Sequence, residues 1–228
     1  MRKDGTRFPV EVHISPFTHR GEAVMLCAIN DVTERKKMAD QVRQMAFYDP
    51  LTGLPNRRLL NDRLSQTMAA SKRNALFGAL MFLDLDNFKP LNDRHGHAVG
   101  DLLLIEVARR LSECVREVDT VARLGGDEFV VLLAELDEDR ARATEQAGAV
   151  AEKVRVSLAQ PYVLDTSDSG QPHAQVRHHC SASIGVVVFV AHEASQVDLL
   201  RRADAAMYQA KDAGRNAIRF AATLPSPS

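Results

Sequence analysis

The sequence predicts an α+β fold in which helices flank a central, mostly antiparallel sheet. Residues 121–133 (VARLGGDEFVVLL) consist of two apolar strand-like runs joined by a glycine pair, and glycine accepts the positive φ of a tight hairpin turn without steric cost. Strands and helices alternate on both sides of this hairpin, in the order α-β-α-β-β-α-β-α. Such an alternation around one hairpin indicates a ferredoxin-like, or palm-like, core that is extended at both ends.

The 228 residues allow one full domain and a fragment of another. A net charge of −1 gives no general affinity for polymeric nucleic acid. No apolar run reaches membrane length and the N-terminus lacks a signal-peptide core, so we expect a cytoplasmic fragment without membrane contact. Membrane segments upstream in the parent protein remain compatible with this expectation. Cys27, Cys114 and Cys180 are widely spaced and predict reduced thiols.

The first 32 residues predict two short strands, 7–14 and 22–30, joined by a turn at 19–21. An isolated hairpin is marginally stable in water, so it is expected to belong to a larger sheet or to form a partner-binding edge. The segments KDGTRFPVEV and INDVTERK resemble the last strands and exit motif of a PAS sensor domain. This resemblance implies that residues 1–32 are the C-terminal fragment of a PAS-like domain.

Residues 33–47 predict a linker helix with Thr33 as its N-cap. Met38, Val42 and Met45 are spaced four and three apart, which is coiled-coil spacing. Two interpretations are equally supported. In one, the helix rests on its own domain; in the other, it pairs in parallel with a second copy and transmits a signal.

The main domain is expected over residues 48–221, and it opens with a turn-rich stretch that ends at Asn56, a suitable N-cap. The predicted elements are a helix at 57–72, a strand at 75–85, a helix at 97–116, the hairpin at 121–133, a helix at 137–158, a strand at 180–190 and a helix at 197–213. Pro90 suits the first turn of a helix after the first strand, and Gly214 suits a helix C′ position. Residues 160–179 are polar and predict a surface loop or loose hairpin, while 222–228 predict a tail.

Two pairs of acids adjoin strongly apolar strands. Asp84 and Asp86 lie two apart, hence on one face of a strand end, and Asp127 and Glu128 begin the second hairpin strand. Buried carboxylates are costly unless a cation or proton neutralises them, and converging oxygen ligands suit Mg²⁺ or Mn²⁺. Either acid of the first pair alone is explained by a strand end and helix cap. Adjacent strand residues point to opposite faces, so either the turn brings Asp127 and Glu128 together or only one is a ligand.

Five motifs occur in a fixed order along the chain: YDPLTGLPNR (48–57), DLDNFKPLNDRHGHAVGD (84–101), RLGGDEF (123–129), SIG (183–185) and ADAAMYQAKDAGRN (203–216). Together they resemble the GGDEF-domain diguanylate cyclases, which condense two GTP molecules into cyclic di-GMP. The resemblance covers Tyr48 to about Phe220. It implies that Asp84 and Asp127 bind the metal ions, that the Leu85 carbonyl and the Glu128 carboxylate assist, and that Asp127 and Glu128 are the catalytic acids.

The resemblance also implies the substrate contacts. Asn92 and Asp101 match the positions that read the guanine edge, for which an amide and a carboxylate are chemically suited. By themselves they would be read as a helix-ending turn and a solvated acid. Lys211 and Arg215 match the phosphate-binding pair, although cations near a helix C-terminus are also favourable with its dipole. Lys89 and the backbone amides after Asp86, including that of Phe88, would bind the remaining phosphate oxygens.

Arg116 and Asp119 form an RxxD motif a short distance before Gly125, where the family has its product-inhibition site. An exposed ion pair of little energetic value is the alternative. Arg123 fits a structural or phosphate-side role. His173, His178, His179 and Cys180 fit no zinc-binding spacing.

The expected function is therefore Mg²⁺- or Mn²⁺-dependent diguanylate cyclase activity in a homodimer, with product inhibition by cyclic di-GMP. The main alternative is a catalytically silent module that binds GTP or cyclic di-GMP and regulates a partner domain. A third hypothesis is that the PAS-like piece acts as a dimer or sensor contact and the isolated fragment is inactive.

Overall fold

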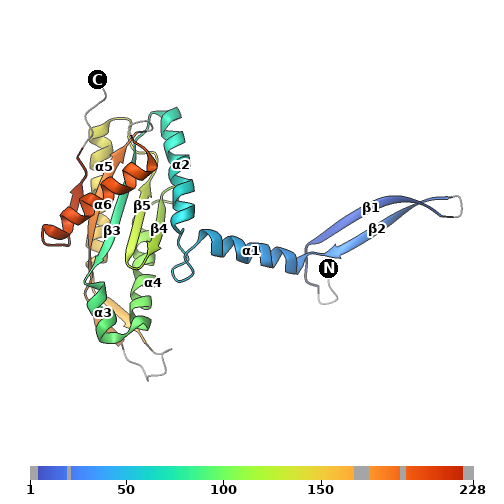
Figure 1. Ribbon diagram of the computed structural model, residues 1–228, viewed down its shortest axis with the longest axis horizontal. Helices are drawn as coiled ribbons and strands as arrows, with labels where there is room; N and C mark the ends of the chain where they lie inside the picture. The colour runs from blue at the N-terminus through green and yellow to red at the C-terminus, as the bar shows by residue number, and fades with distance from the viewer. Residues whose placement is uncertain (1–4, 20–21, 167–174, 191–193, 223–228) are drawn as a thin grey trace. The chain divides into compact units, whose positions relative to one another are not determined.

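The computed structural model describes residues 5–19, 22–166, 175–190 and 194–222. It divides the chain into two compact units, Met1–Ala46 and Phe47–Ser228. Figure 1 shows the course of the chain through both units. Among the described residues, no helix combines the length and the apolar character needed to cross a lipid bilayer.

The first unit contains an antiparallel hairpin and most of one helix. β1 (Val10–His19) pairs with β2 (Glu22–Asp31) along its whole length, so the first strand starts later and runs further than predicted. α1 spans Thr33–Phe47, as predicted. Thr33 is not the N-cap but the first helical residue, and its N–H donates to the Asp31 carboxylate at 2.9 Å.

The second unit is built on a sheet with the strand order β4-β5-β3-β8-β9. Its strands are β3 (Gly78–Asp86), β4 (Thr120–Gly125), β5 (Glu128–Leu133), β8 (Ser181–Phe189) and β9 (Ile218–Phe220). Every neighbouring pair is antiparallel except β8 with β9. The predicted α+β class is confirmed, whereas β9, a short strand at the sheet edge, was not predicted.

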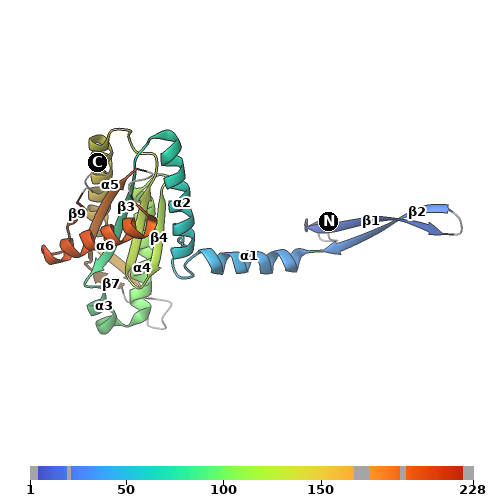
Figure 2. The same cartoon turned by 45° about the horizontal axis from the view of Figure 1, so that its top comes forward.

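Helices cover both faces of this sheet (Figures 1 and 2). α2 (Arg57–Asn74) and α6 (Gln196–Asp212) pack on one face, and α4 (His97–Cys114) and α5 (Arg140–Leu158) on the other. Along β3, Leu80 and Phe82 belong to the α2/α6 core, while Ala79, Met81 and Leu83 belong to the α4/α5 core. Because both faces of the strand are buried, its sequence is continuously apolar instead of alternating.

The helix ends follow local capping chemistry. The Asn56 side chain accepts hydrogen bonds from the amides of Arg58 and Leu59 and caps α2, as predicted. Asp139 caps α5, which therefore begins three residues later than predicted. Gly214 follows α6 with φ of 109°, which fits its predicted C′ role.

Two further segments complete the unit. α3 (Phe88–His95) follows β3 and contains Pro90 in its first turn. β6 (Tyr162–Asp165) and β7 (Gln175–His178) pair as a separate antiparallel hairpin within the stretch predicted to be a loop or loose hairpin.

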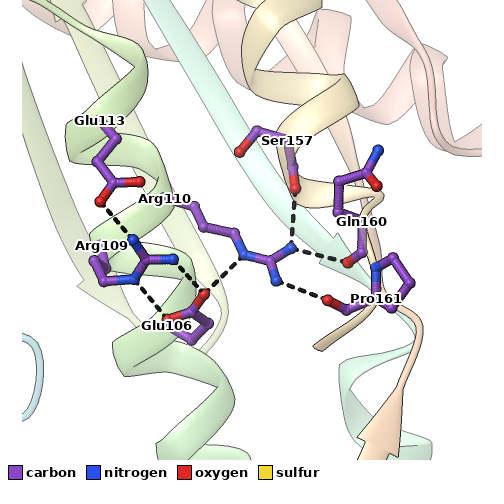
Figure 3. Close-up of polar contacts among 7 residues, drawn as sticks. All are labelled: Glu106, Arg109, Arg110, Glu113, Ser157, Gln160 and Pro161. Atoms are coloured by element: carbon purple, nitrogen blue, oxygen red, sulfur yellow. Dashed lines mark hydrogen bonds and ion pairs between the residues drawn. The ribbon is translucent and has the colours of Figure 1, made fainter. Parts of the chain in front are cut away.

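Arg110 joins α4 to the end of α5 (Figure 3). Its guanidinium donates to the carbonyls of Ser157, Gln160 and Pro161 at 2.8–3.0 Å and lies 3.8 Å from the Tyr162 ring centroid. The carbonyls at a helix C-terminus lack partners within their own helix, and Arg110 donates hydrogen bonds to carbonyls at this helix end. The Glu106 carboxylate accepts hydrogen bonds from Arg109 and Arg110. These bonds lower the pKa of Glu106 to about 2, so Glu106 stays ionised beside Arg110.

Gly185 on β8 marks a close approach between the sheet and α6. A Cβ at this position would lie 2.0 Å from the carbonyl oxygen of Ala203 and 2.2 Å from the nitrogen of Met207. Backbone atoms of a packed helix cannot move aside as a side chain does. We expect Gly185→Ala to lower the free energy of unfolding by about 3 kcal/mol, measured by urea denaturation.

Gly148→Ala on α5 is the matched control. Its Cβ would meet only the Phe220 ring, at an ordinary 3.6 Å. Alanine is more favourable than glycine inside a helix by about 1 kcal/mol, so this variant should be at least as stable as the parent. Equal stability of Gly185→Ala and the parent would contradict the close packing of β8 on α6.

Candidate active site

The hairpin between β4 and β5 places its two acids in different backbone environments. Gly125 pairs with Glu128, so the turn itself consists of Gly126 and Asp127. The expectation that both glycines form the turn and both acids follow on the strand is therefore wrong. Because Asp127 lies in the turn, strand alternation does not force it onto the face opposite Glu128.

Asp84, on β3, faces Glu128 directly across the β3–β5 pairing. Like charges in this position repel each other. Burial, together with the charges of Asp127 and Asp86, raises the pKa of Asp84, while a hydrogen bond from Lys211 acts in the opposite direction. The Lys211 ammonium, from the last turn of α6, lies 2.8 Å from the Asp84 carboxylate.

A pocket lies at the carboxyl end of β3. Three acids, Asp84, Asp86 and Asp127, and three basic residues, Lys89, Lys211 and Arg215, line it. The remaining lining residues are Leu85, Asn87, Phe88 and Pro90. The structure thus gathers residues from three sequence motifs, expected to bind metal or phosphate, around one pocket.

Glu128 lies beside this group in a mixed electrostatic environment. Burial and the charges of Asp84, Asp204 and Asp127 raise its pKa, while the charge of Arg57 acts in the opposite direction. Sequence analysis did not single out Arg57, the first residue of α2, or Asp204 on α6. Both belong to motifs that were quoted there, but nothing in their spacing linked them to Glu128.

Asn92 and Asp101 come together where α3 meets α4. The Asn92 side-chain oxygen is buried and has no hydrogen-bond partner among the described residues. A Cβ at Gly100 would lie 1.9 Å from this oxygen, so Gly100 is needed to accommodate Asn92. Asp101, the next residue, is exposed. Asp101 is therefore accessible to a ligand, whereas the Asn92 side-chain oxygen is packed against Gly100.

Arg123 holds the hairpin turn in place. It donates to the Gly126 carbonyl at 2.8 and 3.1 Å and to the Asp49 carboxylate at 3.0 and 3.2 Å. Burial raises the pKa of Asp49, but hydrogen bonds from Thr52 and Arg123 outweigh it and hold the pKa below its usual value. Of the two expected roles, the structural one fits Arg123. Asp49, which sequence analysis missed, connects the start of the unit to the turn that carries Asp127.

The two members of the RxxD motif differ in exposure. The Asp119 side chain is 1% exposed and accepts hydrogen bonds from the amides of Arg116, at 2.9 Å, and Ala134, at 3.1 Å. The Arg116 side chain is 59% exposed and also donates to the Ala134 carbonyl. Asp119 is thus a buried anchor, and Arg116 is the member that a ligand can reach.

The donor set suits a hard divalent cation. Burial and neighbouring acids raise the pKa of Asp84 and Glu128, so a shared positive charge would stabilise these carboxylates. Mg²⁺ typically combines one or two protein carboxylates with substrate phosphates. Within the described ranges, no three or more metal-ligating side chains form a preassembled cluster. Few protein ligands and an adjoining phosphate pocket are compatible with such a site. Asp84, Asp127 and the Leu85 carbonyl would hold the ion, with Glu128 beside them.

The histidine-rich segment adds no metal-binding site to the described structure. Burial raises the pKa of the Cys180 thiol to about 12, and the thiol donates to the Asp86 carbonyl at 3.3 Å. Such a thiol is unreactive. His173 lies outside the described residues.

Comparison with known proteins shows the family to which the chain belongs. The sequence profile of the family described as "Diguanylate cyclase, GGDEF domain" matches residues 46–217. The chain belongs to the GGDEF domain family. Among curated relatives, the bifunctional diguanylate cyclase/cyclic di-GMP phosphodiesterase MucR of Pseudomonas aeruginosa is 45% identical over 179 residues, covering 78% of this chain and 24% of MucR. Diguanylate cyclase DgcM of Escherichia coli is 36% identical over 215 residues, covering 94% of this chain and 48% of DgcM.

The chain therefore spans less than half the length of either relative. A solved GGDEF structure is also similar. The coiled coil and GGDEF domain of DgcB from Caulobacter crescentus, in complex with c-di-GMP, has a TM-score of 0.70 and 27% identity, covering 83% of this chain and 93% of that one.

The repulsion within the acidic group of this GGDEF domain predicts a stability effect. We expect Glu128→Gln to raise the free energy of unfolding of the metal-free protein at pH 7 by roughly 0.2–1 kcal/mol, because it removes one of two like charges that face each other across the strands. A carboxyl whose pKa is raised on folding binds its proton more tightly in the native state, so it destabilises the fold as pH rises through its titration range. The gain should shrink as the pH falls from 7 to 4.

Urea denaturation at several pH values measures this effect. The control is Glu117→Gln, which changes an exposed acid outside the group and should leave stability unchanged. Loss of stability in Glu128→Gln at pH 7 would show that Glu128 is stabilised, not strained, by its neighbours.

Proposed function

We propose that this chain is a diguanylate cyclase that condenses two GTP molecules into cyclic di-GMP and releases pyrophosphate. The observation that carries the proposal is the pocket at the end of β3, where Asp84 and Asp127 adjoin Lys211 and Arg215. The pocket thereby combines carboxylates suited to a divalent cation with side chains suited to phosphate, and one nucleoside triphosphate could reach both.

Each residue group has a distinct task in this proposal. Lys211, Arg215, Lys89 and the amides near Phe88 bind the phosphates, and Asn92 and Asp101 accept hydrogen bonds from the guanine edge. A bound divalent cation supplies charge neutralisation at the α-phosphate and lowers the pKa of the attacking hydroxyl.

The chemistry consists of two equivalent transfers. The 3′-oxygen of one GTP forms a bond to the α-phosphorus of the other, and the bond between the α- and β-phosphates breaks to release pyrophosphate. The hydroxyl proton passes to a carboxylate of the acidic group. Glu128 suits this role because burial and neighbouring charges raise its pKa toward that of a useful base.

The described residues of one chain form one such pocket, so the joining of two GTP molecules requires two chains that face each other. The exposed apolar residues of α1 support association between copies: Met38, Val42 and Met45 are 63%, 66% and 79% exposed. Pairing through this helix would raise the effective concentration of one half-site near the other. The functional unit proposed here is a homodimer.

A GTP turnover assay with Mg²⁺ tests the function. The rate is measured over a range of protein concentrations, and the product is identified by its mass. We expect cyclic di-GMP at a specific rate that rises with protein concentration. Asp127→Asn should lower the rate at least about 100-fold, since charge at the α-phosphate is no longer neutralised. Asp62→Asn, an exposed acid on α2, is the control and should retain the parental rate.

The other outcomes distinguish the alternatives. GTP binding without product at any protein concentration would favour the silent regulatory module. Substantial turnover by Asp127→Asn would overturn the metal-binding assignment.

Product inhibition through the RxxD motif is a second part of the proposal. The exposed Arg116 guanidinium is suited to phosphate and guanine contacts, and buried Asp119 fixes its backbone. We expect Arg116→Ala to raise the inhibition constant of cyclic di-GMP about tenfold or more, with an initial rate within twofold of the parent.

Initial-rate measurements with added cyclic di-GMP check this expectation. Arg142→Ala on α5 removes an arginine that is 74% exposed and serves as the control. Asp119→Ala is unsuitable, because it would leave buried amides without their acceptor. Unchanged inhibition in Arg116→Ala would discard the RxxD assignment.

A further inference from the structure

Asp86 is chemically unlike Asp84 although the two lie on the same strand and share a motif. It is 2% exposed, and its carboxylate accepts hydrogen bonds from the hydroxyls of Ser181 at 2.6 Å and Ser183 at 2.8 Å. A third bond, of 3.0 Å, comes from the backbone N–H of Asn216. These three donors, two hydroxyls and one backbone N–H, are all neutral. The carboxylate is therefore committed to the protein and is not free to bind a metal ion.

The Asn216 amide belongs to a strained segment. Gly214, Arg215 and Asn216 have φ values of 109°, 64° and 43° in succession. Left-handed backbone is unfavourable for residues other than glycine, although less so for asparagine, and two such residues in a row are expected where surrounding contacts hold them.

Two contacts hold Asn216 in this conformation. Asp86 binds its amide, and Arg155 of α5 donates to its side-chain oxygen at 2.9 Å. Arg155 is itself fixed by an ion pair of 2.6 Å with Glu152. Asn216 is thereby secured from the sheet through its backbone and from α5 through its side chain.

The residue before Asn216 is Arg215, which lines the phosphate pocket together with Lys211. The Arg215 amide donates to the Ala210 carbonyl of α6 at 3.1 Å, so its backbone is held on one side by α6 and on the other by the clamped Asn216. The direction in which Arg215 leaves the backbone depends on both.

We propose that Asp86 is a positioning residue: by fixing the Asn216 amide it holds Arg215 toward the triphosphate of the bound nucleotide. This inference rests on the proposed function, because it concerns the phosphate half of the same site. It assigns to the second acid of the DLD motif a role in nucleotide affinity that passes through another side chain.

The test is the dissociation constant of GTP, with Mg²⁺, and of inorganic tripolyphosphate, both measured by calorimetry. Asp86→Ala should weaken both ligands about tenfold, because Arg215 loses its orientation and with it a charge-assisted hydrogen bond. In an Arg215→Ala background, the same change should have less than a twofold effect. A double-mutant cycle of this kind separates action through Arg215 from an independent effect.

Asp86→Asn is the conservative variant. Its amide oxygen can accept from Asn216 while its NH₂ group donates to a serine hydroxyl, which is able to accept. Affinity should therefore stay within about threefold of the parent. A metal ligand would not be replaced in this way, so strong loss of affinity or of Mg²⁺ dependence in Asp86→Asn would overturn the positioning role.

Ser71→Ala is the control for general destabilisation. Ser71 is 5% exposed, donates to the Leu76 carbonyl and is not among the residues that line the phosphate pocket. Its removal should lower the melting temperature and leave both dissociation constants unchanged. If Asp86→Ala does not fold, Arg155→Ala, which loosens Asn216 from the other side, should raise both constants in the parent and not in the Arg215→Ala background.

The outcomes distinguish failure of the proposed function from failure of the positioning role alone. A parent protein that binds neither GTP nor tripolyphosphate would overturn the proposed function together with this inference. A parent that binds both, with affinities that Asp86→Ala leaves unchanged or lowers equally in the Arg215→Ala background, would overturn the positioning role alone.

Discussion

Repulsion between carboxylates at one end of a buried sheet is the constraint on which the rest of the site depends. Asp84 and Glu128 face each other across β3 and β5, and both have raised pKa values because burial and neighbouring acids disfavour their charges. A sheet covered on both faces offers them little water. Nearby cations, Lys211 on Asp84 and Arg57 near Glu128, offset part of this cost. The remaining imbalance favours a divalent cation, whose charge would be shared between these carboxylates and the phosphates of a nucleotide.

Two other acids hold parts of this site in place. Asp49 anchors Arg123, which binds the Gly126 carbonyl and so fixes the turn that carries Asp127. Asp86 anchors the chain next to Arg215. Asp49 accepts from a guanidinium, and Asp86, although it lines the pocket, has its carboxylate occupied by two hydroxyls and a backbone N–H. In the proposed function, acids of similar appearance in the sequence thus divide into those that face the ligand and those that hold its binding residues.

This division explains what the sequence predicts and what it does not. The α+β fold follows from local patterns: the apolar run of β3, the glycine pair of the hairpin and the Asn56 cap are each visible within a few residues. The separate roles of Asp84 and Asp86 are not, because their spacing is that of one strand face. What distinguishes Asp86 is its partners, which lie 95 to 130 residues later in the chain. β9, with three residues, likewise becomes recognisable only through its pairing with β8.

The proposed reaction places a second demand on the chain, since the one such pocket formed by its described residues requires a second chain to supply the other. α1 has 15 residues, and a helix of this length is marginal in water and offers only about two heptads for pairing. Association through α1 alone is therefore expected to be weak. Weak pairing suits regulation, because a change of a few kcal/mol in helix packing is enough to shift a two-state equilibrium from mostly apart to mostly paired. A strong dimer helix would keep the half-sites together whatever the state of the segment that precedes α1.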